Sequence, residues 1–480
     1  MAQDIPLLTL KRPLTVSKAS VEPVADTDTA WTRLIYSYAA TATFWLIWGT
    51  LIGLYLSIKF ATPDIDHVSW LSYGRLRPVH TNTVFWGWAT LAMIAAALYV
   101  VPRTSMRRLW SIPLAWVSLW LVNISVLVGD LLLMAGINNG GQEYREYIWP
   151  VQAVFAVGVI LVAYNLIRTI ADRGIEEIYI SNWYIMAAFL WTIPLIVIAY
   201  IPAYQQNAIS ETVIQGYYMH MGVGMWFTPM VLGLTYYVLP KLLNKPIYSY
   251  SLGVLAFWTQ MTFYTMIGAH HFIFAPTPWW LQTVAIIFSV GMIITLAAGT
   301  GNFLLTMRGE GRAIARSYSL PFILAGVISY FFFSAQGSLE AIRSIQGLWH
   351  FTNYTVAHSH LTMYGFVVLL IWGALYGILP RLTGHEPPAF WVGVHFWFAV
   401  VGLVLYSTAL MVGGTVQGLS WMSGSPFIDS VKAMASYWLW RAVGGTLMFL
   451  SHIIFAFNMW SMRPRPATSP ATAGAAEVAA

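Results

Sequence analysis

The chain has 480 residues, of which 58% are hydrophobic and only 9% are charged, with a formal net charge of +6. Soluble proteins carry roughly 25% charged residues, so this composition excludes a soluble globular protein and indicates a polytopic membrane protein. The positive charge does not indicate nucleic acid, because the basic residues lie in short loops between apolar runs. The chain has no cysteine, which excludes disulfides and thiolate metal sites and leaves histidine as the expected metal ligand.

Apolar runs predict twelve membrane spans, because a membrane helix needs about 20 apolar residues. The spans are expected at 31–59, 79–101, 109–137, 148–170, 179–202, 213–240, 250–274, 279–306, 314–335, 350–380, 388–416 and 434–462. Residues 31–462 are therefore predicted to form one all-α domain with twelve transmembrane helices. The segments 1–30 and 463–480 are rich in Pro, Ala and Thr, contain no apolar signal-peptide core, and are predicted to be disordered cytoplasmic tails.

Lysine and arginine are distributed unequally between the two sides of these spans, which predicts the orientation of the chain. One side has only Lys59, Arg75, Arg77, Arg145, Arg343 and Lys432. The other side collects Lys11, Arg12, Lys18, Arg33, Arg103, Arg107, Arg108, Arg168, Arg173, Lys241, Lys245, Arg308, Arg312, Arg316, Arg381, Arg463 and Arg465. We therefore expect both termini on the cytoplasmic side of a bacterial inner membrane.

Six histidines are predicted to lie at one depth in the membrane. The second, sixth and tenth spans carry histidines near their starts, and the seventh span carries two at its end; they are His80, His220, His358, His360, His270 and His271. Even-numbered spans begin outside and odd-numbered spans end outside, so all six fall in the outer half. Scattered structural histidines have no reason to agree in depth, and ionisable groups at membrane depth are functional candidates. A shared metal or cofactor site is the main hypothesis.

The spacing of these histidines indicates how they are used. His358 and His360 are two residues apart, about 200° around a helix, so they can ligate two cofactors that lie side by side. The alternative is a pair of hydrogen-bonded interior histidines. His270 and His271 are about 100° apart, and with His220 they can form a three-imidazole site. Imidazoles without acid or thiolate neighbours favour copper or iron.

Several other side chains are candidates near these histidines. Tyr264 lies about one and two-thirds turns before His270, on much the same face as His271. A phenol beside a redox metal can supply a proton and an electron, and the alternative for this tyrosine is packing. His350 lies nearer the outer surface than His358 and is expected to hydrogen-bond a cofactor carboxylate. The remaining histidines are interpreted as structural; they are His67, His385, His395 and His452.

Charged residues on the predicted outer loops have two interpretations. Arg75 and Arg77 are suited to pairing with propionate-type carboxylates, or they are ordinary interfacial arginines. Glu143 and Glu146 can coordinate a hard cation such as Ca²⁺, or they pair with Arg145 or neighbouring arginines.

The motifs as a set resemble a known family. They are Gly74-Arg75-Leu76-Arg77-Pro78-Val79-His80-Thr81-Asn82, Tyr248-Ser249-Tyr250, Gly268-Ala269-His270-His271, His358-Ser359-His360 and Arg441-Ala442-Val443-Gly444-Gly445. The chain resembles subunit I of the haem–copper oxidoreductases, and specifically the catalytic subunit of cbb3-type cytochrome c oxidase. The resemblance covers nearly all of the chain between the tails, including the number of spans.

The resemblance implies a ligand for each metal. His80 and His360 would ligate a low-spin haem b, and His358 a high-spin haem b that faces a copper. The copper ligands would be His220, His270 and His271. Tyr264 matches a tyrosine that in the family is covalently joined to the copper ligand corresponding to His220.

The resemblance also implies a function. The protein would be a respiratory terminal oxidase that reduces O₂ to water. Electrons would come from a soluble cytochrome c through partner subunits with covalent haem, and protons from the cytoplasm.

The sequence departs from the family pattern at several positions. The family has a glutamate before Gly at the end of the ninth span, where this chain has Gln336 after Ser334. Tyr330 matches the family's proton-channel tyrosine, whereas Gly253 replaces a polar channel residue. Asn353 stands where the family tends to have an aspartate near the high-spin haem propionates. Together these changes indicate a divergent branch.

Two other functions are considered. A nitric oxide reductase of the same superfamily would use non-haem iron with nearby glutamates. The sixth span reads His220-Met-Gly-Val-Gly-Met-Trp, without a glutamate near the histidine, which favours copper and O₂. The third candidate is a non-catalytic haem-binding membrane subunit or a transporter. Loss of a metal-site histidine would favour that candidate, and none is missing.

Overall fold

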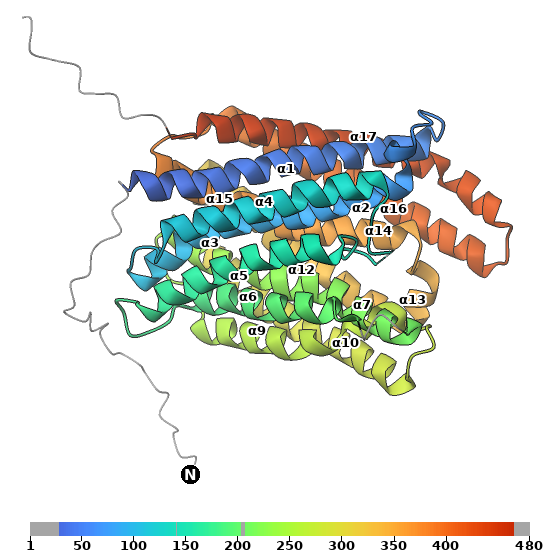
Figure 1. The fold of residues 1–480 in the computed structure, drawn as a ribbon, viewed down its shortest axis with the longest axis horizontal. Coiled ribbons are helices and arrows are strands. Elements are labelled where there is room, and N and C mark those ends of the chain that lie inside the picture. Colours follow the sequence, from blue (N-terminus) through green and yellow to red (C-terminus); the bar gives the residue numbers. More distant parts are fainter. Residues whose placement is uncertain (1–27, 141, 203–206, 465–480) are drawn as a thin grey trace, which may run out of the picture.

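The computed structural model describes residues 28–140, 142–202 and 207–464. The predicted tails, 1–30 and 463–480, lie almost entirely outside this range. The described residues form α-helices without a β-strand, and most helices run along the long axis of the molecule (Figure 1). Backbone groups in lipid cannot bond to water, and a helix satisfies them internally. The predicted all-α membrane fold is confirmed.

The first half of the described chain contains α1 (Thr29–Ala61), α2 (Tyr73–Asn82), α3 (Thr90–Ser105), α4 (Ile112–Ala135), α5 (Trp149–Ala171), α6 (Ile180–Ala199), α7 (Ala208–Met221) and α8 (Thr228–Leu243). The second half contains α9 (Tyr250–Phe263), α10 (Trp279–Met307), α11 (Gly311–Arg316), α12 (Leu320–Glu340), α13 (Arg343–Trp349), α14 (Asn353–His360), α15 (Leu369–Thr383), α16 (Ala389–Met422) and α17 (Phe427–Ser461).

Eleven of the twelve predicted spans appear, within the described ranges, as helical segments long and apolar enough to cross a membrane. The exception is the span predicted at 250–274. There α9 has only 14 residues and is followed by two 3-10 turns, η5 (Tyr264–Met266) and η6 (Gly268–Phe272). These turns carry Tyr264, His270 and His271. The seventh span is therefore irregular at the residues for which the sequence predicted a function.

The other three helices that carry the candidate histidines are also irregular. Short π-helical segments follow His80, His220 and His360 within three residues. They are η2 (Thr83–Ala89), η4 (Gly222–Phe227) and η7 (Leu361–Val368). Single π turns inside α-helices are frequent at functional sites, because they change the direction of the side chains around them.

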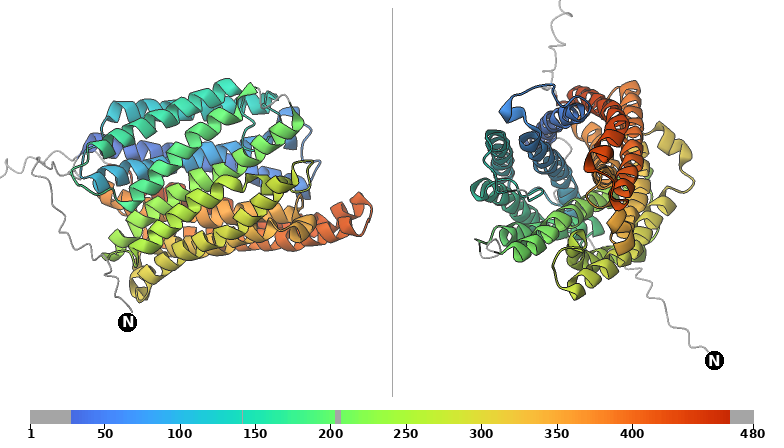
Figure 2. Two further views of the ribbon diagram at one scale, coloured as in Figure 1. Left: turned by 90° about the horizontal axis from the view of Figure 1, so that it is seen from below. Right: turned by 90° about the vertical axis from the view of Figure 1, so that its right-hand side faces the viewer.

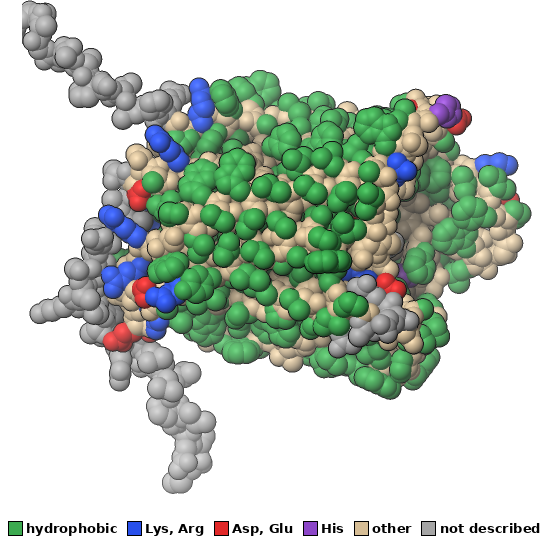
Figure 3. Space-filling model, viewed as in Figure 1, with side chains coloured by type: hydrophobic (Ala, Val, Ile, Leu, Met, Phe, Trp, Pro, Cys, Tyr) green, Lys and Arg blue, Asp and Glu red, His purple; other side chains and the backbone are tan. Residues whose placement is uncertain are grey.

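The helices pack as one bundle in which α1 lies against α17 and so brings the two ends of the chain together. Both described ends lie at the same end of the bundle (Figures 1 and 2). Lysine and arginine side chains gather at that end on the visible face (Figure 3). The helices α7, α13 and α14 lie toward the opposite end (Figure 1). The tip of the α16–α17 hairpin projects beyond that end (Figures 1 and 2).

A buried carboxylate connects the start of η2 to α4 and to the loop after it. Asp130 in α4 is 2% exposed. Its Oδ2 accepts a hydrogen bond from the Thr83 hydroxyl at 2.6 Å, and its Oδ1 accepts one from the Tyr147 hydroxyl at 2.8 Å. Asp130 therefore fixes three segments relative to one another close to His80.

We expect Asp130→Ala to lower the thermal stability of the protein. The substitution leaves the Thr83 and Tyr147 hydroxyls buried without their acceptor, and each unsatisfied buried group costs about 1–3 kcal/mol. The midpoint of thermal unfolding of the detergent-solubilised complex is the measurement. Asp429→Ala, at an exposed position in the first turn of α17, is the matched control and should leave the midpoint nearly unchanged. Equal midpoints for the two variants would contradict the role of Asp130.

Candidate functional site

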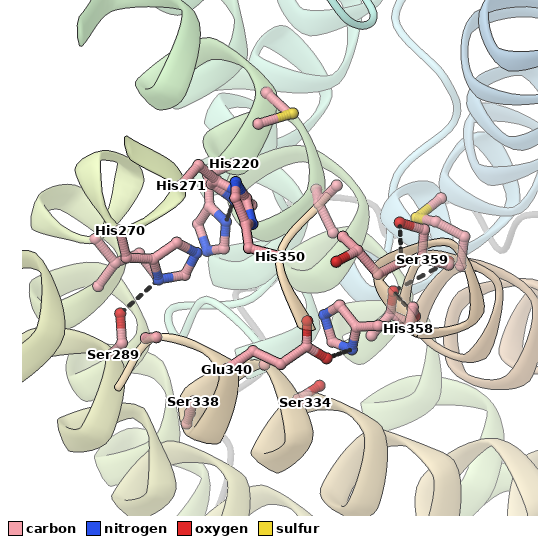
Figure 4. A pocket seen from close by; sticks show the side chains of 18 of the residues that line it. His220, His270, His271, Ser289, Ser334, Ser338, Glu340, His350, His358 and Ser359 are labelled. Atoms are coloured by element: carbon pink, nitrogen blue, oxygen red, sulfur yellow. Dashed lines mark hydrogen bonds and ion pairs between the residues drawn. The ribbon is translucent and has the colours of Figure 1, made fainter. Parts of the chain in front are cut away.

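Three histidines meet at one point (Figure 4). His220 comes from α7, and His270 and His271 come from η6; one ring nitrogen from each lies within 4.8 Å of the others. The ring centroids are 4.4 Å apart for His220 and His270, and 5.0 Å apart for His220 and His271. His220 lies deeper in its helix than predicted, because the span begins at Ala208 and not at 213.

Hydrogen bonds orient these imidazoles. The Ser289 hydroxyl donates to the Ala285 carbonyl, so its oxygen accepts from Nδ1–H of His270 at 2.7 Å. This bond leaves the Nε2 lone pair of His270 free to bind a metal ion. Nδ1 of His220 and Nε2 of His271 are 2.8 Å apart and form a hydrogen bond, in which one of the two nitrogens carries the proton. Nε2 of His220 is buried without a hydrogen-bond partner among the described residues.

The donor set fits a single copper ion. Metal–imidazole bonds are about 2 Å long, so the donor atoms around one ion lie within about 4 Å of one another. The possible donor atoms of the three rings lie within 4.8 Å of one another, close to this separation. The group of possible ligands found in the described parts of the chain is made of imidazoles alone, which suits copper better than a hard cation.

Tyr264 lies against His220. Their rings are 4.9 Å apart with an interplanar angle of 19°. The prediction that Tyr264 lies on much the same face as His271 assumed a continuous helix. In the structure α9 ends at Phe263 and the chain continues as 3-10 turns. Gly224 of η4 makes this position available, because any side chain there would collide with the Tyr264 ring. No pattern in the sequence indicated this role of Gly224.

A cavity of about 460 Å³ connects these groups with the next histidine. Its lining includes His220, His270, His271, Tyr264, Tyr330 and His358. His358 extends from α14 toward α12, where Gly337 leaves room for its ring; a Cβ on Gly337 would lie 3.0 Å from Nε2 of His358. Nδ1 of His358 is 3.7 Å from Oε1 of Glu340 (Figure 4). A cavity with one imidazole opposite three others fits a haem that faces a copper.

His80 and His360 form a second pair. Their rings are 6.4 Å apart and nearly parallel, with an interplanar angle of 15°. Nδ1–H of His80 donates to the Gly49 carbonyl at 2.7 Å, and that of His360 to the Val356 carbonyl at 2.9 Å. The Nε2 lone pair of His80 thus remains available to a metal, and that of His360 accepts a hydrogen bond from the Tyr406 hydroxyl at 3.2 Å, which a metal ion would replace. Two metal–imidazole bonds of about 2 Å and two half-rings together span a distance close to the observed one.

Two glycines of α1 let it approach the segment that carries His80, Gly53 beside the His80 ring and Gly49 beside Val84 and Thr83. The Gly49 carbonyl binds Nδ1 of His80, and a Cβ on Gly53 would lie 2.7 Å from the same atom. The two glycines are four residues apart, a spacing that lets helices approach closely in membranes. This spacing was a signal in the sequence that could have identified them.

The arginine and glutamate candidates pair with each other. Arg77 forms ion pairs with Glu143 and, at 3.5 Å, with Glu146. Glu146 also accepts from the Asn82 amide at 2.8 Å, and burial raises the pKa of Glu146 to about 7. The carboxylates therefore already have partners, and the geometry does not fit a Ca²⁺ site unless Arg77 moves away. Calcium binding at Glu143 and Glu146 stays a prediction.

The other arginines of this region have separate partners. Arg75 donates to the Met134 carbonyl at 3.0 Å. Arg145 is fully buried and pairs with Glu211 of α7 at 3.2 Å, not with Glu143 or Glu146. Arg145 thus links the loop before α5 to the helix that carries His220.

His350 and Asn353 lie at the same end of the site. His350 lines the cavity near His271 (Figure 4), and burial lowers its pKa. The Asn353 amide donates to Gln417 at 2.9 Å and accepts from Trp438 at 3.4 Å. Their roles toward haem carboxylates stay predictions.

Of the three residues predicted for a proton path, two line the cavity. Tyr330 is 1% exposed and its hydroxyl has no hydrogen-bond partner in the described chain, and Ser334 lies one turn further along α12. Gln336 is not among the lining residues, and its place on a proton path stays a prediction. It is two residues beyond Ser334, about 200° around the helix, and its buried side-chain nitrogen has no hydrogen-bond partner among the described residues.

Polar groups continue from Tyr330 toward the end of the bundle where the chain ends lie. Asn302 bonds to the backbone of Ser249 at 2.8 Å and reaches the Tyr236 hydroxyl at 3.4 Å. A Cβ on Gly253 would lie 3.4 Å from that hydroxyl. Tyr236 therefore occupies the space beside Gly253, where the sequence predicted the loss of a polar channel residue. The sequence analysis did not identify Tyr236 or Asn302.

Two histidines that were interpreted as structural have ordinary hydrogen bonds. His395 bonds to the Tyr376 hydroxyl at 2.9 Å. His452 bonds to Thr50 at 3.0 Å and to Tyr364 at 3.1 Å. These contacts agree with a structural role.

Comparisons with known proteins agree with this geometry. The family described as Cytochrome C and Quinol oxidase polypeptide I matches residues 33–447. The Cbb3-type cytochrome c oxidase subunit CcoN1 of Stutzerimonas stutzeri is 29% identical over 94% of this chain and 98% of its own length. A cytochrome c oxidase subunit 1 homolog of Agrobacterium tumefaciens is 30% identical over 88% of this chain and 82% of its own length.

Two further similarities are more distant. A nitric oxide reductase polypeptide of Stutzerimonas stutzeri is 21% identical over 88% of this chain and 94% of its own length. A solved heme-copper terminal oxidase dimer has a TM-score of 0.76 at 16% identity, covering 92% of this chain and 85% of that one, which shows the shared fold. The matches confirm the resemblance drawn from the motifs. The chain is an integral membrane oxidoreductase that belongs to the Cytochrome C and Quinol oxidase polypeptide I family, the subunit I family of the haem–copper oxidases.

Proposed function

We propose that the chain is the catalytic subunit of a cbb3-type terminal oxidase, which reduces O₂ to water. The observation that carries this proposal is the group formed by His220, His270 and His271, with Tyr264 stacked on His220. Within the described residues this group contains imidazoles and no carboxylate, which supports copper and O₂.

In the proposed site, each metal has its own ligands. His220, His270 and His271 would hold copper, His358 a high-spin haem b, and the pair His80 and His360 a low-spin haem b. When bound, the haem iron and the copper supply electrons for the four-electron reduction of O₂. The protein supplies fixed imidazole donors and an apolar enclosure that limits access of water.

Tyr264 would supply a proton and an electron from its hydroxyl group. Its ring is held between His220 and Gly224, so the phenol cannot turn away from the cavity. Proton uptake would follow Asn302, Tyr236 and Tyr330 from the end of the bundle where lysine and arginine gather. By the positive-inside rule that end is cytoplasmic. Both termini would then be cytoplasmic, in a bacterial inner membrane.

The proposed electron supply comes from the opposite, outer side. The helices that carry His80 and His360, α2 and α14, lie toward the end of the bundle away from the described chain ends (Figure 1). Partner subunits with covalent haem, and a soluble cytochrome c donor, would reach the low-spin haem from there.

A nitric oxide reductase is the second candidate. It is favoured by the similarity to the nitric oxide reductase polypeptide of Stutzerimonas stutzeri and by a carboxylate, that of Glu340, which lines the cavity beside His358. Glu340 lies beside His358 and is not part of the three-histidine group, which favours the oxidase. A non-catalytic haem-binding subunit has less support, because the structure brings together all the histidines that the metals require.

The metal content of the purified complex tests the choice between these functions. We expect one copper and two non-covalent haem irons per chain, after subtraction of covalently bound haem iron. Copper and iron are measured by elemental analysis, and haem by its extracted absorbance. A third, non-haem iron together with no copper would contradict the oxidase and support the nitric oxide reductase.

Tyr264→Phe tests the chemical role of the phenol. Removal of a positioned proton donor lowers rates by about 10² to 10⁴-fold, so O₂ consumption should fall by at least about 10²-fold while both haems stay bound. Oxygen uptake with an artificial electron donor and the haem spectrum are the measurements. Tyr164→Phe, at a half-exposed position in α5, is the matched control. Near-normal turnover of Tyr264→Phe would rule out the proposed role.

Gly53→Val tests the low-spin haem site. A side chain at this position would displace the ring of His80, so the low-spin haem should be lost while the high-spin haem remains. Gly301→Val in α10 is the control, because a Cβ there meets no atom within 4 Å. The reduced-minus-oxidised spectrum and the haem content per chain are the measurements. A normal low-spin signal in Gly53→Val would contradict the close packing of α1 on His80.

A further inference from the structure

His452 of α17 is a buried imidazole inside the bundle, 1% exposed, which the metal sites do not use. Ionisable side chains at membrane depth are candidates for a function. The ring lies between α1 and η7: its Nδ1 is 3.0 Å from the Thr50 hydroxyl, and its Nε2 is 3.1 Å from the Tyr364 hydroxyl. These contacts hold the ring in place, but the number of protons in them indicates more than a structural role.

The contact at Nδ1 fixes one proton on the imidazole. The Thr50 hydroxyl donates its proton to the Leu46 carbonyl at 2.6 Å, so the Thr50 oxygen can only accept. Nδ1 of His452 therefore carries a hydrogen in both the neutral and the charged form of the ring. Nε2 is the atom at which the ring gains or loses a proton.

The contacts at Nε2 have room for one more proton. The Tyr364 hydroxyl lies 3.1 Å from Nε2 of His452 and 3.1 Å from the Ser451 hydroxyl. Ser451 donates to the Met448 carbonyl at 2.6 Å, so its oxygen accepts as well. While His452 is neutral, the single phenol proton has two acceptors, and one contact lacks a hydrogen. A proton on Nε2 completes both contacts, because Nε2–H then donates to Tyr364 and Tyr364 donates to Ser451.

His452 lies close to the proposed low-spin haem site without belonging to it. Thr50 directly follows Gly49, whose carbonyl accepts from Nδ1 of His80 at 2.7 Å. In the described chain His452 forms no hydrogen bond or ring contact with His80 or His360, yet it interacts electrostatically with His80. Charges inside a bundle of low dielectric are screened less than in water. A charge at His452 therefore acts on an iron held by His80.

The surroundings of His452 do not compensate a positive charge on its ring. Besides the Tyr364 phenol, the ionisable groups that act on it are His80 of α2 and His395 of α16. From α1 it meets a threonine hydroxyl, and from α15 the neutral Trp372, whose ring centroid is 5.6 Å away. Among the described residues no carboxylate forms an ion pair with His452. A proton at Nε2 is thus a net positive charge near the haem site.

Polar groups continue from His452 toward the end of the bundle where the described chain ends lie. Asn458, three residues before the end of α17, donates to the Tyr376 hydroxyl at 2.9 Å, and that hydroxyl lies 2.9 Å from Nδ1 of His395. The Trp372 ring lies 4.4 Å from the His395 ring, on the way to His452. Nε2 of His395 and Nε1 of Trp372 are buried without a partner among the described residues. Buried polar atoms of this kind bind water, and water there can carry protons.

We propose that His452 is a redox-linked proton site of the low-spin haem. His452 binds a proton at Nε2, taken from water at the end of the bundle where the described chain ends lie, when an electron reaches that haem. The imidazolium offsets the added negative charge. When the electron moves on, the proton leaves Nε2 and Tyr364 again donates to it. The inference rests on the proposed function only through the assignment of His80 and His360 as the ligands of that haem.

The pH dependence of the low-spin haem potential, measured in the purified holo-complex, tests this inference. Proton binding and reduction favour each other to the same extent, so the wild-type potential should fall as the pH rises. His452→Gln keeps a polar side chain that does not titrate, so the dependence should become weaker while the haem content and the pH dependence of the high-spin haem stay the same. His385→Gln, in the loop after α15, is the matched control and should keep the full dependence. An unchanged dependence in His452→Gln would overturn the proposal.

Two further measurements cover the case in which His452→Gln does not assemble. In the wild-type protein, infrared difference spectra between the oxidised and reduced low-spin haem should show an imidazolium that forms on reduction, identified with isotope-labelled histidine. Carbon monoxide keeps the high-spin haem reduced during this measurement. Tyr364→Phe removes the oxygen to which Nε2–H donates, so the pH dependence of the potential should weaken there too. Absence of the imidazolium bands, or the full wild-type dependence in Tyr364→Phe, would each contradict the proposal.

His80→Ala separates this inference from the proposed function. Loss of the low-spin haem in His80→Ala supports the ligand assignment on which both depend. If the low-spin haem remains, the assignment fails, and with it the proposed site. If the haem is lost in His80→Ala but His452→Gln keeps the full pH dependence, only the role of His452 fails.

Discussion

The site depends on hydrogen bonds that fix which nitrogen of each imidazole is free. A neutral imidazole has one donor and one acceptor nitrogen, so a bond from Nδ1–H leaves the Nε2 lone pair for a metal. The carbonyls of Gly49 and Val356 do this for His80 and His360, and Ser289 does it for His270. Water cannot replace these acceptors inside an apolar bundle. The protein must therefore provide each acceptor at hydrogen-bonding distance.

That requirement accounts for the irregular helices. Each of the four spans that carry the histidines departs from regular α geometry at or within three residues of its histidine, three through π segments and one through 3-10 turns. Glycines lie where another group must approach closely: Gly53 beside His80, Gly224 beside Tyr264 and Gly337 beside His358. A regular helix with larger side chains at these three positions would keep the neighbouring rings away from their places. The irregularities are thus the means by which the rings reach common points.

A common depth for the six histidines was predicted from hydrophobic length and from the lysine and arginine distribution, which are set by the bilayer. In the structure three of them meet in one group and two others form a pair. The opposite directions of His358 and His360 also follow from 100° per residue. His358 does face the cavity, and His360 does face His80. The contact of Tyr264 could not be predicted, because a periodic helix was assumed where the chain forms 3-10 turns. Tertiary contacts such as Tyr236 beside Gly253 leave no periodic signal at all.

The end of α12 shows why position in the sequence is an incomplete guide to such a site. When the chain is compared position by position with the family pattern, Gln336 stands in place of a glutamate and indicates that a carboxylate has been lost. Glu340 follows one turn later, and its side chain leans back over the turn that contains Gly337 and faces His358. Residues three or four apart share a face of a helix, so the distance from the carboxylate to Nδ1 is set by the fold and does not follow from position in the sequence.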